Sequence, residues 1–384
     1  MYPKLRFKGF DDAWEQRKLS DIGNIITGST PSTKDKNNYN GDFLFVSPAD
    51  IQGNRFVEKT ITTLSELGFK KGRILAPKST LFVSIGSTIG KVAQIRDFAV
   101  TNQQINSIEP FKDIDPDFVF SLMQKESPSI RCLSATQAVP ILNKTTFSNV
   151  EVSIASNINE QYRIGELFIK LDSTITLHQR QCEALKKQKR FFLQNMFPKE
   201  GESEPRIRFN GFTEPWEQRK CKTLCSISTG KSNTQDQVDD GEYPFFIRSD
   251  KAVKSNKYLY DEEAVITIGD GNIGKVFHYV NGKFDLHQRC YKMTNFIDVT
   301  AKYFYYYFSK NFYKRAMSMT AKATVDSVRL EMIADMDIQF PTDMSEQKLI
   351  ADYFSNLDNL ITLHQRQYEQ LVSLKKYLLS KMFI

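Results

Sequence analysis

Two glycine-rich segments that end in a lysine are the first candidates for binding chemistry. They read IGSTIGKV at residues 85–92 and IGDGNIGKV at residues 268–276. The second copy fits the spacing G-x-x-x-x-G-K, but valine follows where a nucleotide-binding loop needs a Ser or Thr hydroxyl for magnesium, and the first copy is one residue short. We therefore expect glycine turns whose lysines, Lys91 and Lys275, face nucleic-acid phosphates or solvent, and we expect no ATP site.

A polar segment follows each glycine turn. The first is TNQQIN at Thr101–Asn106 and the second is DLHQR at Asp285–Arg289. Asn and Gln can bond adenine through two hydrogen bonds, and Arg can bond guanine in the same way. The alternative is that these side chains cap turns and satisfy backbone groups, and the sequence leaves both interpretations open for any single residue.

Two further polar segments, 29–34 after Gly28 and 228–233 before and after Gly230, are candidates for contacts with phosphate. The complete set of candidate DNA-contacting residues is Ser29, Thr30, Lys34, Lys91, Asn102, Gln103, Gln104, Asn106, Lys231, Asn233, Asn272, Lys275, His287, Gln288 and Arg289.

Signatures of catalysis and of metal binding are missing from the sequence. It contains neither an Asn/Asp-Pro-Pro-aromatic motif nor a glycine-rich cofactor loop, and no carboxylate pair recurs at catalytic spacing in both halves. Cys221 and Cys225 are four residues apart, but no second Cys/His pair completes a zinc site nearby. We expect a binding protein with no catalytic residue and no metal ligand, whose five scattered cysteines are reduced in the cytoplasm.

The overall composition permits a nucleic-acid partner without requiring one. The chain has 384 residues, with 52 Lys and Arg against 45 Asp and Glu, which gives a net charge of +7. No apolar run is long enough to span a membrane, and the N-terminal MYPKLRFKGF lacks the apolar core of a signal peptide.

The elements that must position these residues are duplicated in the chain. RFKGFDDAWEQRK at 6–18 returns as RFNGFTEPWEQRK at 208–220, and LDSTITLHQRQ at 171–181 returns as LDNLITLHQRQ at 357–367. The segments between these copies barely match each other. Matching motifs around dissimilar segments predict two similar domains that recognise two different targets.

Each half ends in a long helix with a heptad seam. Mostly apolar residues recur at alternating spacings of four and three from Ile164 to Met196, and the second copy, from Ile350 to Met382, matches this seam position by position, including the polar pair His178 and His364. We expect these two histidines to set the register of the helices. One amphipathic helix of about 55 Å cannot bury its seam alone, so the two helices are expected to pack against each other, antiparallel if a two-fold axis relates them.

Shorter elements are expected between the repeats. Leu81–Ile85 and Ala264–Ile268 are predicted to be strands, and Asp117–Gln124 and Tyr303–Lys310 are predicted to be short helices. The aromatic run YFYYYF at 303–308 could stack on bases, but its counterpart carries Val and Leu, so a packed helix is favoured.

These elements predict an α+β fold with two similar α/β domains and two long antiparallel coiled-coil helices. The expected boundaries are a first domain at 1–158, a first helix at 159–197, a linker at 198–207, a second domain at 208–344 and a second helix at 345–384.

The doubled opening F-x-G-F-x-x-x-W-E-Q-R-K resembles the specificity subunits of type I restriction–modification enzymes. The approach to each long helix, NEQYRIGELFIKLD at 159–172 and SEQKLIADYFSNLD at 345–358, shows the same resemblance. The P-x-L-N signature of that family is present at Pro140–Asn143, whereas the second half has DSVR at 326–329.

The resemblance implies two target recognition domains, each of which reads one half of a split double-stranded DNA target. It also implies that the helices set the spacer length and dock two modification subunits, and that restriction subunits join a larger complex. S-adenosylmethionine, ATP and Mg²⁺ would then belong to the partner subunits, with no cofactor on this chain. A stand-alone DNA-cleaving enzyme and a coiled-coil scaffold without a DNA role are the alternatives, and the sequence gives neither the DNA target nor the spacer length.

Overall fold

The computed structural model describes residues 1–134, 140–199, 201–320 and 327–384. The chain divides into two compact units. The first unit comprises Met1–Gln181 with His364–Ile384, and the second unit comprises Cys182–Leu363. Each unit holds one α/β domain and a part of each long helix, α5 (Ile158–Asn195) and α9 (Met344–Met382).

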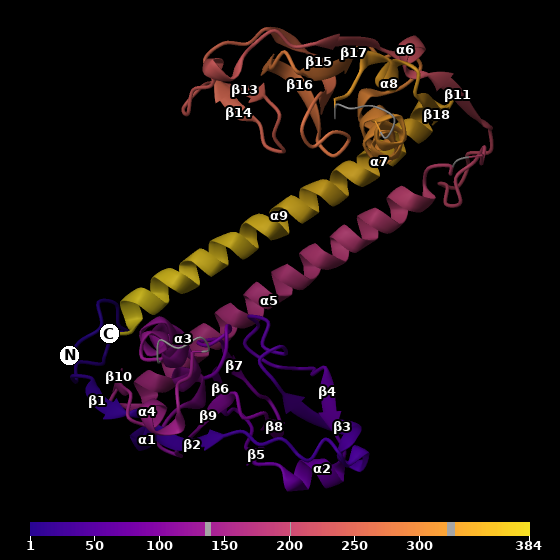
Figure 1. Cartoon of the computed structure of the whole chain (residues 1–384). Helices are drawn as coiled ribbons and strands as arrows, with labels where there is room; N and C mark the ends of the chain where they lie inside the picture. Colours follow the sequence, from indigo (N-terminus) through magenta and orange to yellow (C-terminus); the bar gives the residue numbers. More distant parts are fainter. Residues whose placement is uncertain (135–139, 200, 321–326) are drawn as a thin grey trace. The chain divides into compact units, whose positions relative to one another are not determined.

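The domain of the first unit is built from three small sheets (Figure 1). The first and last strands of the domain, β1 (Glu15–Lys18) and β10 (Glu151–Ile154), pair antiparallel. The second sheet is antiparallel and has the order β2 (Gly23–Thr27), β9 (Ile105–Pro110), β6 (Thr80–Val83), β7 (Val92–Gln94). The third has the order β4 (Thr62–Leu64), β3 (Tyr39–Val46), β8 (Ala99–Thr101), β5 (Ile74–Leu75), and its β3–β8 pair is parallel. The remaining short elements are α1 (Leu19–Ile22), η1 (Lys36–Asn38), α2 (Glu66–Lys71) and α4 (Lys144–Ser148).

Helix α3 (Pro116–Cys132) covers strands β6, β7 and β9 of the first domain. It begins where Asp115 accepts a hydrogen bond from the Phe118 amide at 2.7 Å, with Pro116 in the first turn. Its buried face meets Trp14, whose ring lies 5.6 Å from that of Phe118. Phe383, at the end of α9, packs against the same tryptophan at 5.8 Å, so the last turn of α9 completes the core of the first domain.

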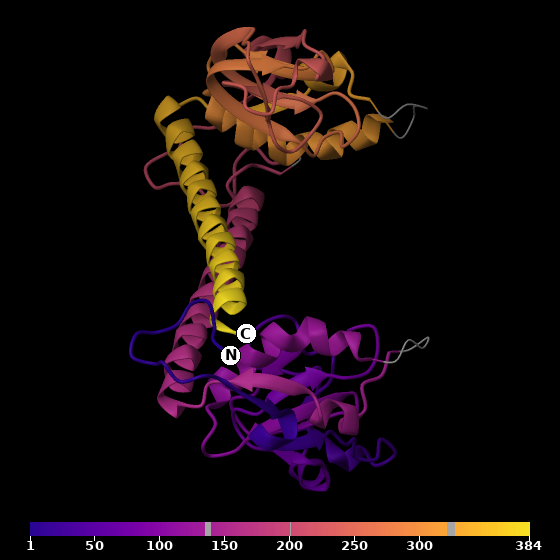
Figure 2. The ribbon, with the colours of Figure 1, turned by 90° about the vertical axis from the view of Figure 1, so that its left-hand side faces the viewer.

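The domain of the second unit repeats this plan with one larger sheet (Figure 2). Strands β11 (Trp216–Lys220) and β18 (Asp337–Pro341) pair antiparallel. The six-stranded sheet has the order β12 (Ser226–Thr229), β17 (Cys290–Thr294), β15 (Tyr260–Ile268), β16 (Phe277–Leu286), β13 (Tyr243–Phe246), β14 (Val253–Ser255). Helix α7 (Ala301–Thr320) packs on β15 and β16. The short elements are α6 (Cys221–Leu224), η2 (Thr234–Asp236) and α8 (Leu330–Ala334).

The aromatic run at 303–308 forms the buried face of α7. Tyr303, Phe304 and Phe308 are fully buried, which confirms the prediction of a packed helix and removes these three rings from any contact with bases. Phe197, just beyond the end of α5, stacks on Phe354 and contacts Tyr303, in the same way that Phe383 enters the first core.

The repeated sequence motifs hold each domain to the start of its long helix. Arg6 donates two hydrogen bonds, of 2.7 and 2.8 Å, to the fully buried carboxylate of Glu160. Arg208 does the same for Glu346 at 2.7 and 2.9 Å. Such two-point Arg–carboxylate pairs are strong and directional, which explains why the R-F-x-G-F opening and the E-Q pair recur together.

The two long helices are antiparallel, as predicted. In the first unit Asp172 pairs with Lys375 and His178 meets His364, with 3.0 Å between the two Nδ1 atoms. In the second unit Lys189 pairs with Asp358, and the ring of Phe192 lies 5.2 Å from that of Tyr353. In each unit the partner number on α9 falls as the number on α5 rises, and each pair includes at least one residue of the predicted seams.

Several elements differ from the predicted boundaries. Helices α3 and α7 continue well beyond the predicted 117–124 and 303–310 segments, because α3 tolerates Pro128 and α7 has no helix-breaking residue until its end. The predicted strand 81–85 ends at Val83 in β6, because Ile85 leaves the sheet to form an isolated bridge with Ile141. Among the described helices, none is long and apolar enough to cross a membrane.

Candidate nucleic-acid interface

The predicted polar segments occupy the same place in both domains. Three backbone hydrogen bonds fix the first segment, and three equivalent bonds fix the second, which aligns Asn102 with His287, Gln103 with Gln288 and Gln104 with Arg289. The paired bonds, donor first, are Gly28–Ile105 and Gly230–Cys290, Ser29–Thr101 and Lys231–Leu286, and Asn102–Val46 and His287–Phe246. The two domains therefore share the same backbone arrangement in this region, and the side chains that it carries differ.

This arrangement requires a glycine in each domain, because the backbone at Gly28 or Gly230 lies directly against the backbone of the second polar segment. A Cβ atom at Gly28 would lie 2.1 Å from the carbonyl oxygen of Asn102, and one at Gly230 would lie 2.2 Å from that of Leu286. No larger residue fits at this distance without moving the backbone. Each glycine therefore places its own polar segment, beginning at Ser29 or Lys231, beside the second polar segment of its domain.

In the first domain this region is a cluster of amides and hydroxyls. Thr30 donates to the Gln103 side chain at 2.6 Å, and the Asn102 side chain donates to that of Gln104 at 3.0 Å. Gln103 is exposed at the surface. Asn106 lies deeper, 2% exposed, where it accepts a 2.6 Å hydrogen bond from Thr27. The cluster presents neutral donors and acceptors of the type that reads base edges.

In the second domain the same region carries charge. The guanidinium of Arg289 pairs with the Asp270 carboxylate at 2.8 Å, and Arg248 approaches the same carboxylate at 3.3 Å. Gln288 donates to the side chain of Asn233 at 2.6 Å, so here too a side-chain hydrogen bond joins the two polar segments. Arg248 and Asp270 are not among the residues predicted from the sequence, because Asp270 lies in a segment notable for its glycines and Arg248 belongs to no motif.

His287 is buried in this region and contributes a neutral imidazole. It is 5% exposed, and its Nδ1 accepts a hydrogen bond from the Arg289 amide at 3.1 Å. Burial lowers the pKa of His287, and the positive charge of Arg248 lowers it further. His287 thus supports the loop in its uncharged form. It lines a hollow of about 280 Å³ together with Thr234, Ile247, Arg248, Asp270 and Gly271.

The predicted phosphate-contacting lysines lie in different settings. Lys34, Lys231, Lys275 and Asn272 are exposed, and the amine of Lys275 lies 5.4 Å from the ring centre of Tyr313. Lys91 instead donates to the carbonyl of Ile51 at 3.0 Å. Contact of these residues with phosphate stays a prediction.

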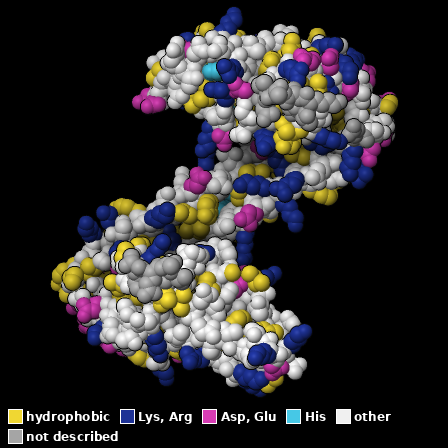
Figure 3. All heavy atoms as spheres, in the orientation of Figure 1, with side chains coloured by type: hydrophobic (Ala, Val, Ile, Leu, Met, Phe, Trp, Pro, Cys, Tyr) yellow, Lys and Arg dark blue, Asp and Glu magenta, His cyan; other side chains and the backbone are white. Residues whose placement is uncertain are grey.

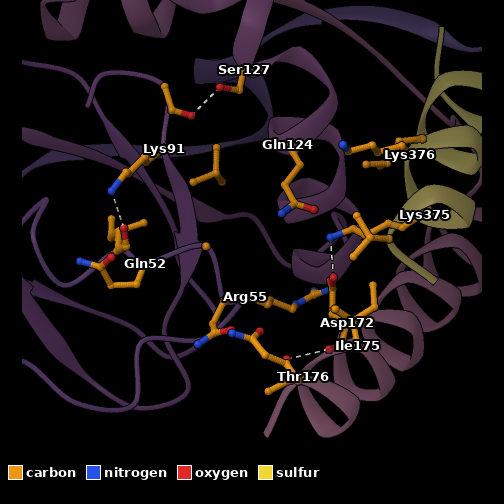
Figure 4. Close-up of a pocket in the computed structure, with 18 of the residues that line it drawn as sticks. Gln52, Arg55, Lys91, Gln124, Ser127, Asp172, Ile175, Thr176, Lys375 and Lys376 are labelled. Atoms are coloured by element: carbon orange, nitrogen blue, oxygen red, sulfur yellow. Dashed lines mark hydrogen bonds and ion pairs between the residues drawn. The ribbon is translucent and has the colours of Figure 1, made fainter. Parts of the chain in front are cut away.

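Lys91 lines a groove of about 610 Å³ in the first unit, between the domain, α5 and α9 (Figure 4). Asp172 of α5 lies in this groove, bound by Lys375 of α9 and by Arg55 of the domain at 3.2 Å. Arg55 also pairs with Asp117 at 2.6 Å. Burial lowers the pKa of Lys375 and of Arg55, and the neighbouring carboxylates oppose that shift. The groove therefore contains an ion-pair network that joins the domain to both helices.

Charge on the surface is distributed rather than concentrated. On the face seen in Figure 3, Lys and Arg side chains are spread over both domains and the helices, with Asp and Glu side chains among them. Among the described residues, no three His, Cys, Asp or Glu side chains are grouped so that they could hold a metal ion. Cys221 and Cys225 are free and buried, with their sulfur atoms 3.5 Å apart.

Known proteins resemble both halves of this chain. The family model described as "Type I restriction modification DNA specificity domain" matches residues 11–187 and 213–373. The type I restriction enzyme HindI specificity subunit of Haemophilus influenzae is 32% identical over 143 residues, which are 36% of this chain and 31% of that protein. The MjaIX specificity subunit of Methanocaldococcus jannaschii is 25% identical over 60% of this chain and 56% of that protein. The chain thus matches about a third of the first relative and just over half of the second.

Two further similarities extend over nearly the full chain. The MjaVIII specificity subunit of Methanocaldococcus jannaschii is 21% identical, with 96% of this chain and 91% of that protein covered. The crystal structure of a type I restriction-modification S subunit from M. genitalium has the same fold, with a TM-score of 0.78, 12% identity and coverage of 100% and 99%. Because the family model matches both halves of the chain, this chain belongs to the type I restriction modification DNA specificity family.

Proposed function

We propose that this chain is the DNA-recognition subunit of a type I restriction–modification complex, in which each domain reads one half of a bipartite target. The observation that carries the proposal is the pair of matched loop frames. Identical backbone bonds hold Asn102–Gln104 in one domain and His287–Arg289 in the other. Amide side chains suit adenine and guanidinium side chains suit guanine, so the two loops are suited to different base pairs.

Exchange of one domain tests this function directly. Residues 208–344 would be replaced by the equivalent segment of another family member, and methylated sites would be mapped across the genome of a strain that carries the chimaera. We expect one half of the methylated motif to change and the other half to stay. The reciprocal exchange, of residues 1–158, is the matched control and should change the other half. A chimaera in which both halves change would contradict independent reading.

We further propose that two modification subunits dock on the long helices. Exposed apolar side chains recur there at equivalent positions of the duplicated sequence: Leu177 on α5 and Leu363 on α9 are 53% and 49% exposed, and Phe191 and Tyr377 are 53% and 56% exposed. Large apolar residues on a solvent-facing helix surface favour a protein partner. Because they occur once per repeat, they support two equivalent partners. Restriction subunits would join the larger assembly.

In this proposal the chemistry resides on the partners. S-adenosylmethionine would bind the modification subunits, and ATP and Mg²⁺ would bind the restriction subunits, while this chain contributes no catalytic residue. Purified chain incubated with S-adenosylmethionine and target DNA should transfer no methyl groups, and addition of modification subunits should start the transfer. Methylation by the chain alone would refute this division of roles.

A further inference from the structure

The Asp270 carboxylate lies between two arginines in the second domain. Arg289 donates to Asp270 Oδ2 at 2.8 Å, and Arg248 lies 3.3 and 3.4 Å from Oδ2 and Oδ1. Partial burial favours a raised pKa for Asp270, but the hydrogen bonds and charges of Arg289 and Arg248 outweigh it and lower the pKa. Asp270 is thus ionised at neutral pH, and the three side chains together carry one net positive charge.

The backbone around this cluster is fixed, so the three side chains meet through the fold. The Gly269 amide donates to the Arg289 carbonyl at 2.8 Å, and the Val328 amide donates to the Gly269 carbonyl at 2.7 Å. The arginine heads remain accessible, because the side chains of Arg248 and Arg289 are 46% and 62% exposed while that of Asp270 is 21% exposed. Asp270, Gly271 and Arg248 line the hollow of about 280 Å³, and a Cβ atom at Gly271 would meet no atom within 4 Å, so the backbone next to Asp270 is open.

The first domain has the same backbone without the charges. The Ser84 amide donates to the Gln104 carbonyl at 2.7 Å, and the Leu142 amide donates to the Ser84 carbonyl at 2.8 Å. This aligns Ser84 with Gly269, Ile85 with Asp270 and Gln104 with Arg289. The carboxylate and its arginine are therefore a feature of the second domain and not a requirement of the shared frame.

We propose that Asp270 is a positioning residue that aims Arg289 at a guanine edge and keeps both arginines off the DNA backbone. The inference rests on the proposed DNA-reading function. A free guanidinium binds any phosphate, which gives affinity without sequence information. A carboxylate 2.8 Å from the guanidinium repels phosphate oxygens, and it holds the planar head in one orientation. The O6 and N7 acceptors of guanine are neutral, so they suffer much less of that repulsion.

This arrangement predicts an unusual result for Asp270→Asn. Loss of the carboxylate adds one net positive charge, so binding to random DNA should become tighter and the salt slope should grow by about one unit. At the same time the released Arg289 should lose its preference for guanine at one position, by about 5- to 150-fold. Asp239→Asn removes the same charge from an exposed site of the same domain and is the control. It should leave the base preference intact.

The measurement uses the full chain assembled with its modification subunits and a duplex library randomised across the second half-site. The wild-type complex should select guanine at one position, and Asp270→Asn should lose that position alone. An unchanged preference, or an equal loss at every position, would overturn the positioning role. Failure of the wild-type complex to select any sequence would instead refute the proposed function.

A charge-conserving variant tests whether the orientation of Arg289, and not the net charge alone, sets the base preference. It also serves if Asp270→Asn destabilises the fold. Asp270→Glu keeps the negative charge but moves the carboxylate outward by one methylene group. We expect its salt slope to equal that of the wild type and its guanine preference to fall at the same single position. If Asp270→Asn lowers the unfolding midpoint of the second unit, Asp270→Glu decides the question, and equal weakening at every position by this variant would refute the proposal.

Discussion

Asp172 and Asp358 occupy the same position in the two copies of the long helix, and the structure predicts very different effects of changing them. Asp172 pairs with Lys375, and their side chains are 10% and 13% exposed. Asp358 pairs with Lys189, and these side chains are 36% and 23% exposed. The two pairs join equivalent residues of the repeats and differ in burial, and Asp172 has a second ion pair, with Arg55 at 3.2 Å.

Asp172→Asn should destabilise the first unit by about 3–5 kcal/mol, the usual cost of leaving a buried charge without its partner. Arg55 keeps its ion pair with Asp117 at 2.6 Å, but the buried Lys375 loses its ion pair with Asp172. Asp358→Asn should cost at most about 1 kcal/mol, because the more exposed Lys189 can be hydrated.

The two tryptophans allow each unit to be followed separately. Trp14 and Trp216, 4% and 8% exposed, are the only tryptophans and lie in different units. Unfolding in urea would be followed by fluorescence, with Trp216→Phe as the background for Asp172→Asn and Trp14→Phe for Asp358→Asn. The double variant Asp172→Asn with Lys375→Met should recover most of the lost stability, because no charge stays unpaired. Equal costs for the two Asp→Asn variants would refute the reasoning from burial.

Three further predictions follow from individual residues. Burial, aided by the charge of Lys199, lowers the pKa of Lys310 to about 8. The unfolded chain therefore binds more protons than the folded chain between pH 8 and 10.5, and the cost of the buried charge is full below pH 8 and fades as the pH rises. Lys310→Met should stabilise the second unit at pH 7 by about 1 kcal/mol, after allowance for solvent screening. Urea titrations at pH 10 should show little gain in stability. Arg289→Ala should weaken binding by about 1–3 kcal/mol and relax one base position, whereas Lys275→Ala should weaken all sequences alike and reduce the salt slope by about one; equal losses on target and random DNA for Arg289→Ala would exclude base reading. Duplication of residues 174–177 lengthens α5 by about 6 Å. Methylome mapping should therefore show a spacer between the half-sites that is longer by one or two base pairs, with both half-sites retained. An active variant with the old spacer would show that the helices do not set the spacer length.

The long helices were predictable because their signal is local and repeated. A heptad seam repeats every few residues, and the two copies agree at each seam position, so the packing partner could be inferred as well. The helix start could also be located from the repeated Glu-Gln pair, although only the structure shows its function. Gln161 bonds the Asp115 amide at 3.0 Å, and Gln347 bonds the Thr300 amide at 2.8 Å.

The sheets and the charged cluster could not be predicted from local patterns. The parallel pairing of β3 with β8 joins strands more than fifty residues apart, and no periodic signal specifies such a partner. In the same way, Arg248 and Arg289 meet Asp270 only because the turns after β13, β15 and β16 converge. Gly28 and Gly230 stand where two stretches of backbone approach too closely for a Cβ atom, which is a requirement that the sequence does display, whereas contact of the neighbouring polar residues with DNA stays a prediction.

The duplicated helix aspartates restrict how the two domains can diverge. Each aspartate has one partner from the opposite helix and one from the adjacent domain: Asp172 accepts from Arg55 at 3.2 Å, and Asp358 accepts from the Tyr306 hydroxyl at 2.9 Å. The partners on the opposite helix, Lys375 and Lys189, occupy equivalent positions of the repeat. The domain partners differ in residue type and in their place in the domain. The two domains differ in their recognition loops, yet each supplies a hydrogen-bond donor to this carboxylate. An exchanged domain that lacks such a donor should read its own half-site and yet be held less firmly to the helices.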